Sequence, residues 1–244
     1  MRRPPPSRSA RRPAPSRLRA APGRRSGADR RRSAGRAVLA CSALVLWAGA
    51  ADAHPHVFVT AREQVLFDAD GRVTGVRADW TFDDMYSSFV TQGLGTPGEL
   101  LTRDQLAPLA KTNVESLAEF GYFTVAKLSG HALEFGAPVD YWLDESPDKL
   151  VTLHFTLPLK APAKPAPALN VSVYDPTYFV DFRMADRDPV ALVAAPSGCS
   201  TSVIKPRPLD ASDNQKLSEA FFANMSPGQD FGIKLASKVM VACP

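Results

Sequence analysis

The densest group of metal-binding side chains in the sequence is His54-Pro55-His56, which directly follows Ala51-Asp52-Ala53. Small residues at the first and third positions of that tripeptide fit a signal-peptidase site, so we expect cleavage after Ala53. The new N-terminus would then carry an α-amine beside two imidazoles. Neutral imidazole binds Zn²⁺, Ni²⁺ and Co²⁺ well, and a metal readily displaces the α-amine proton. The segment predicts part of a divalent transition-metal site.

This segment needs further ligands from the fold. A histidine third from a free N-terminus suggests a square-planar chelate with two backbone amide nitrogens, but Pro55 has no amide hydrogen and blocks that chelate. Zinc requires three or four ligands. His154 and Asp83 are the candidates to join His54 and His56. The alternatives are a solvated strand histidine for His154, a helix cap for Asp83, and a solvated strand end for the pair itself.

The stretch before the cleavage site has the composition of a secretory leader. Residues 1–36 contain 13 arginines, and residues 37–50 form an apolar run. That run is shorter than the ~20 residues of a membrane-spanning helix. We therefore expect residues 1–53 to be removed and residues 54–244 to act in the periplasm. Without the leader, the chain would contain 16 basic and 23 acidic residues. This excess of acidic residues argues against nucleic-acid binding.

Two cysteines remain in the expected mature chain, Cys199 and Cys243. An even number of cysteines in an oxidising compartment favours a structural disulfide, with thiolate metal ligation as the alternative. Such a bridge would close a loop of about 45 residues, worth roughly 4 kcal/mol in the chain-entropy model.

Apolar and polar residues alternate along residues 57–67 and again along residues 76–82. With Asp70-Gly71 between them, these two stretches predict an antiparallel hairpin. His54 and His56 share the parity of Thr60 on the more polar face. Both imidazoles are therefore expected to point the same way, away from the densest apolar face.

Two capping-box patterns predict helices. Thr102 and Gln105 open the first, an amphipathic helix over 102–120 whose apolar stripe we interpret as core and not as a binding groove. Ser212 and Gln215 open the second, a C-terminal helix that ends near Ser226.

Residues 122–183 again favour strands, so the chain predicts an α+β fold with largely antiparallel sheets around a central helix. Within this region, residues 175–182 form a polar bend that contains Asp175, Tyr178 and Asp181. The dipeptide Asp175-Pro176 is typical of a turn, which by itself needs no ligand to explain it. Polar side chains at a bend between strands also make these three residues candidates for a pocket.

Several segments of the chain carry a family resemblance. They are His54-Pro-His-Val-Phe-Val59, Trp80-Thr-Phe-Asp-Asp-Met-Tyr86, Leu106-Ala-Pro-Leu-Ala110, Asn113-Val-Glu-Ser-Leu117, Asp140-Tyr-Trp-Leu143, Leu153-His-Phe-Thr-Leu-Pro158 and Tyr174-Asp-Pro-Thr-Tyr-Phe-Val180. Together they resemble the DUF1007 family over essentially the whole mature chain, and the last segment is the most specific. The resemblance implies a periplasmic component of an uncharacterised ABC-type transport system, associated with nickel, cobalt or zinc transport genes.

The sequence departs from some relatives of that family, which carry an EF-hand-like loop before the capped helix. Here the corresponding positions are Leu94, Thr96 and Gly98, with Gln105 at the last one. None of them supplies a carboxylate, and therefore no calcium site is expected.

Three functions fit these observations. The first is a non-enzymatic periplasmic accessory or binding protein for Zn, Ni or Co that serves an inner-membrane transporter. The second is a metal-free structural or interaction protein of the envelope. The third is a copper enzyme that uses the N-terminal histidine as a brace, and it has the least support because no substrate site is evident.

Overall fold

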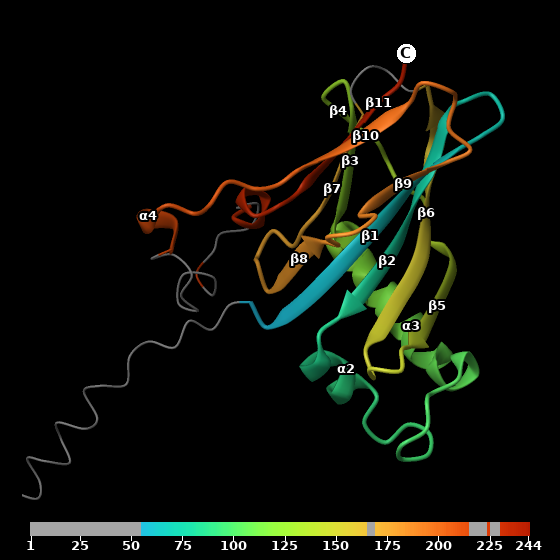
Figure 1. Ribbon diagram of the computed structural model, residues 1–244, viewed down its shortest axis with the longest axis vertical. Coiled ribbons are helices and arrows are strands. Elements are labelled where there is room, and N and C mark those ends of the chain that lie inside the picture. The colour runs from blue at the N-terminus through green and yellow to red at the C-terminus, as the bar shows by residue number, and fades with distance from the viewer. Residues whose placement is uncertain (1–54, 165–168, 215–223, 225–229) are drawn as a thin grey trace, which may run out of the picture. The chain divides into compact units, whose positions relative to one another are not determined.

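The structure of the chain is a computed structural model that describes residues 55–164, 169–214, 224 and 230–244 (Figure 1). The expected leader, His54 and residues 215–223 of the expected C-terminal helix lie outside the described residues. The strands are β1 (Val57–Phe67), β2 (Val73–Phe82), β3 (Thr124–Leu128), β4 (His131–Ala132), β5 (Val139–Glu145), β6 (Val151–Ala163), β7 (Leu169–Val173), β8 (Val180–Met184), β9 (Val190–Val193), β10 (Ser200–Ile204) and β11 (Lys238–Ala242). The helices are α2 (Asp84–Val90), α3 (Arg103–Leu117), η1 (Ala118–Phe123), α4 (Ala211–Asn214) and η2 (Gly232–Lys234).

The first sheet has the strand order β5-β6-β2-β1-β8, and β9 also pairs with β1. The β1–β2, β2–β6 and β5–β6 pairs are antiparallel, as the alternating pattern predicts. β8 and β9 instead run parallel to β1, because the chain returns to this sheet from another sheet and not through a hairpin. The second sheet is antiparallel throughout, with the order β10-β11-β7-β3-β4.

The alternating residues of β1, β2 and β6 bury one face of the first sheet. Near the α3 end this face packs on the helix through Leu106, Ala110 and Val114. Toward the other end it packs on the second sheet, where Val65 and Val171 belong to a separate buried cluster. The helix α3 and the second sheet thus share the apolar face of the first sheet (Figure 1), and the prediction of a largely antiparallel α+β fold is confirmed.

The capping box at the start of α3 forms as its sequence predicts. The Thr102 hydroxyl accepts a hydrogen bond from the Gln105 amide, and the Gln105 side chain accepts one from the Thr102 amide. The α-helix ends at Leu117, and η1 continues to Phe123. The prediction that the whole stripe is core is wrong at Phe120, whose side chain is 57% exposed.

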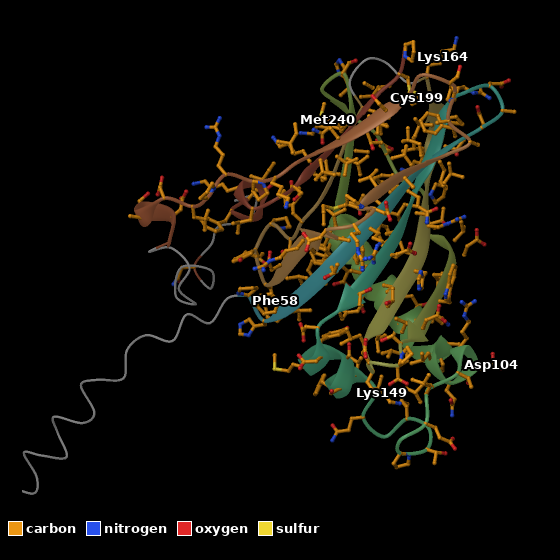
Figure 2. The ribbon with its side chains drawn as sticks, viewed as in Figure 1. Phe58, Asp104, Lys149, Lys164, Cys199 and Met240 are labelled. Carbon is orange, nitrogen blue, oxygen red and sulfur yellow. A yellow bond between two sulfur atoms is a disulfide. The ribbon has the colours of Figure 1, made fainter. Side chains whose placement is uncertain are left out.

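Cys199 and Cys243 form the predicted disulfide, with Cα atoms 4.1 Å apart. The bond joins two neighbouring strands of the second sheet, because Ser200 pairs with Ala242. Figure 2 shows Cys199 at the opposite end of the fold from Phe58. A disulfide is consistent with a secreted protein. Within the described ranges, no helix is long and apolar enough to cross a membrane.

Candidate functional site

The start of β1 is fixed to the end of β2 by Asp83. The Phe58 amide donates a hydrogen bond to one oxygen of the Asp83 carboxylate at 2.7 Å. The other carboxylate oxygen accepts from the Tyr86 amide at 2.8 Å and caps α2. Figure 2 shows Phe58 at this end of the sheet, near α2. Asp83 therefore acts as a structural cap with both oxygens engaged, whatever else it binds.

His56 lies immediately before β1. Its amide donates to the Phe179 carbonyl at 2.9 Å, and its ring centroid lies 4.7 Å from that of Phe179. His56 and Phe58 are both exposed, on the side of the strand expected from parity. Asp84, the residue after the cap, is also exposed and accepts from the Met85 amide through one oxygen. His56 is thus a solvent-accessible group two residues before Phe58, and Asp84 is one directly after Asp83.

His154 lies in a different place, within a polar cluster on the outer face of the first sheet. Its Nδ1 is 2.5 Å from Asp79 Oδ1, and its Nε2 is 3.4 Å from Asp144 Oδ2. Its ring stacks on Trp142, with centroids 4.6 Å apart, and the Arg103 guanidinium lies 5.0 Å from the centroid of Trp142. Both guanidinium contacts from Arg103 go to the Asp144 carboxylate, at 2.7 and 2.9 Å. This cluster joins α3 to the edge strand β5 and to the sheet.

The strand register separates His154 from His56. Arg62 pairs with Asp79, and Asp79 pairs with His154 across β2 and β6. Arg62 lies six residues beyond His56 along β1, which corresponds to roughly 20 Å at about 3.3 Å per residue. The structure therefore does not bring His154 to His56, and the expectation that His154 completes their ligand shell fails on distance.

Replacing Asp79 with asparagine is expected to destabilise the fold by about 1–3 kcal/mol at pH 7, because the charge-assisted bond to His154 is lost. The His154 hydrogen bond holds the pKa of Asp79 below its usual value. The stabilisation that the Asp79 carboxylate contributes is thus present above its unfolded pKa. It is lost as the pH falls below about 4 and through the folded pKa. Urea unfolding of wild type and Asp79→Asn at pH 3 to 7 measures this. The exposed Asp148→Asn is the control, and parallel behaviour of the two variants would contradict the role of Asp79.

Asp175, Tyr178 and Asp181, the residues of the predicted pocket, together line only a small hollow of about 10 Å³. The larger hollows on either side of it divide these residues. Asp175 is buried, and its carboxylate accepts from the Thr177 amide, the Thr177 hydroxyl and the Val180 amide. Tyr178 and Asp181 line a separate cleft with Arg183, whose Nε lies 2.7 Å from Asp181 Oδ2. Burial and the nearby Asp181 charge raise the pKa of Tyr178. Asp175 is thus a turn residue at the wall of a cavity.

That cavity, which we name the aromatic cavity, has a volume of about 390 Å³. It lies between the first sheet, α2, α3, η1 and the turn at residues 175–180. Seven aromatic side chains line it, among them Trp80, Tyr86, Phe120 and Phe179. The sequence shows these aromatics only as scattered members of separate elements. No local pattern signals that they meet.

Glu63 is a second feature of interest, and the alternation of β1 already places it on the apolar face, because it shares the parity of Ala61 and Val65. Its side chain lies on the buried face of β1 and is 1% exposed. One oxygen accepts a hydrogen bond from Trp80 Nε1 at 3.0 Å, while Oε2 has no partner within the described residues. Burial, with a smaller contribution from the Asp79 charge, raises the pKa of Glu63 to about 8 although the Trp80 bond lowers it. Glu63 is therefore largely protonated at pH 7.

Across the described residues, no group of three or more His, Cys, Asp or Glu side chains is arranged to hold a metal ion. A metal site at the start of β1 would thus need ligands outside that part of the chain, of which His54 is the nearest.

The chain is similar over most of its length to one protein family and to a distant relative. An uncharacterized protein of Haemophilus influenzae is 23% identical to this chain over 193 residues, which covers 78% of this chain and 91% of that protein. The family described as "Protein of unknown function (DUF1007)" matches residues 39–243. The match covers residues 39–50 of the apolar run and every described strand and helix. The chain therefore belongs to the DUF1007 family.

Proposed function

We propose that the mature chain is a periplasmic accessory protein that binds a divalent transition metal, Zn, Ni or Co, for an inner-membrane transporter. The supporting observation is the start of β1. There the bond from the Phe58 amide to Asp83 holds the exposed His56 and the Asp83-Asp84 pair at one end of the sheet. Imidazole and carboxylate together are common ligands of these metals.

In this proposal His54, His56 and the α-amine supply nitrogen ligands, and Asp84 supplies an oxygen. Asp83 keeps both oxygens on backbone amides and orients the acidic pair. His154 is left out of the ligand set, because its two nitrogens face Asp79 and Asp144 in another part of the sheet. The metal would sit at an exposed strand end, which suits a protein that exchanges its metal with a partner.

Metal analysis of protein exported to the periplasm tests this proposal, after N-terminal sequencing has fixed the first residue. We expect about one equivalent of metal per chain in wild type and loss of most of it in His54→Ala/His56→Ala. His131→Ala is the matched control, since His131 is an exposed histidine in β4. An Asp84→Asn variant is expected to bind roughly tenfold more weakly, because it loses a charged ligand.

Equal metal content in wild type and the double variant would contradict the proposal, as would metal-free protein in both. The second result would favour a metal-free interaction protein of the envelope. Bound copper with oxygen-dependent turnover would instead favour an enzyme with an N-terminal histidine brace.

A further inference from the structure

The aromatic cavity is too large to be a packing defect. Protein interiors are packed about as densely as organic crystals, with few voids larger than one water molecule. A volume of about 390 Å³ falls within the range of small-molecule sites, which is roughly 300–1,000 Å³. Apolar side chains dominate its wall, so transfer of an apolar ligand from water into it is favourable.

One face of the central helix forms a wall of the cavity. Asn113, Ser116, Leu117 and Phe120 line it from positions i, i+3, i+4 and i+7, although Phe120 lies in η1. Trp80 lies behind the cavity, 1% exposed, and its Nε1 bond to Glu63 fixes the indole in the sheet. Phe120 is 57% exposed and Phe179 is 46% exposed. These two aromatics therefore reach from the cavity wall to solvent and mark its opening.

The polar groups in the cavity restrict the chemistry of a ligand. Asp175 already accepts three hydrogen bonds from its own turn. Tyr86 and Asn113 hydrogen bond to each other through their side chains. Ser116, one turn further along the helix, adds a hydroxyl. Among the described residues that line the cavity none is a lysine, arginine or histidine, so nothing there neutralises an anionic ligand.

We propose that the aromatic cavity binds a neutral aromatic molecule of one or two rings that carries a single hydroxyl or carbonyl group. Its rings pack edge-to-face against Phe120 and Phe179, the two accessible aromatics, and its polar group bonds to Asn113 or Ser116. A flexible fatty acid fits less well, because its carboxylate would be desolvated without a cation. His56 does not line the cavity, and binding there does not require the metal site.

Calorimetric titration of the mature protein with 1-naphthol, a two-ring aromatic with one hydroxyl, tests this proposal. We expect saturable binding of one naphthol per chain and a tenfold or greater loss of affinity in Ser116→Phe, which fills the opening. Thr112→Phe adds the same ring to an exposed position one turn earlier on α3 and is expected to stay within about twofold of wild type. Decanoate is expected to bind at least tenfold more weakly than naphthol.

A second variant tests whether the loss of affinity in Ser116→Phe comes only from the added side-chain volume. Phe120→Ala removes a half-exposed ring without filling the cavity and is also expected to weaken naphthol binding. Absence of saturable naphthol binding to wild type would overturn the proposal. So would an equal effect of Ser116→Phe and Thr112→Phe, or tighter binding of decanoate. Because the titration uses metal-free protein, its outcome is separate from that of the metal analysis.

Discussion

Glu63→Gln is expected to stabilise the protein by roughly 3 kcal/mol at pH 7. In wild type the folded state keeps Glu63 protonated up to a pKa of about 8, whereas the unfolded chain ionises it near 4.5. The folded pKa is the higher one, so this group's contribution is fully present below pH 4.5. It is lost progressively as the pH rises toward 8. Glutamine is neutral in both states and removes that loss.

The substitution also preserves the local geometry. A glutamine carbonyl can accept the Trp80 Nε1 hydrogen bond that Glu63 Oε1 accepts at 3.0 Å. The amide nitrogen takes the place of the protonated Oε2, which has no partner within the described residues in wild type. Shape is therefore matched, whereas the amide carries two N–H donors in place of the single O–H of the protonated carboxyl. The extra donor adds an offset that does not vary with pH. The pH dependence of the difference between the two proteins thus isolates the cost of keeping the carboxyl neutral.

Urea unfolding at half-unit steps from pH 5 to 8.5 measures this difference. The gap between wild type and Glu63→Gln is expected to widen with pH by about 1.4 kcal/mol per unit and to level off above pH 8. Glu115→Gln, an exposed position on α3, is expected to leave the profile unchanged. A constant gap across this range would show that Glu63 ionises normally in the folded protein.

Removal of the disulfide has the other large expected effect. Cys199→Ala/Cys243→Ala is expected to lower the free energy of unfolding by about 4 kcal/mol, because residues 44 apart in sequence are no longer joined in the unfolded chain. The bond links β10 to β11 directly. The last strands of the second sheet should therefore lose hydrogen-exchange protection first.

Guanidinium unfolding with and without reductant provides the control for the disulfide. Reduced wild type is expected to match the double variant, and reductant is expected to leave the double variant unchanged. A loss of less than about 1 kcal/mol in both measurements would mean that the unfolded chain is little constrained by the bond.

Several elements were predictable because local chemistry decides them. The alternation of residues 57–67 fixes which residues of β1 face the core, and Thr102 with Gln105 fixes the start of α3. The pairing of Cys199 with Cys243 was predictable because they are the two cysteines outside residues 1–53. Asp83 behaves as the helix cap that was the alternative to its role as a metal ligand.

Other features depend on which segments become neighbours, and the sequence does not encode that locally. β8 and β9 join β1 in parallel after the chain has passed through the second sheet. The same long-range order puts His154 beside Asp79, Asp144 and Trp142, away from His56. The alternation around His154 is the same whether this histidine joins His56 in a metal site or pairs with neighbouring carboxylates.

The sequence by itself determined the alternating faces of the strands, the start of the central helix and the exposed side on which His56 lies before β1. Each of these depends on residues a few positions apart. The alternation also puts Glu63 on the core face, but only the tertiary structure decided that Trp80 is its hydrogen-bond partner. Only the tertiary structure, too, brings aromatics from four elements to one cavity. Both depend on the packing of distant segments against one sheet face. Burial, more than residue type, sets the pKa of Glu63.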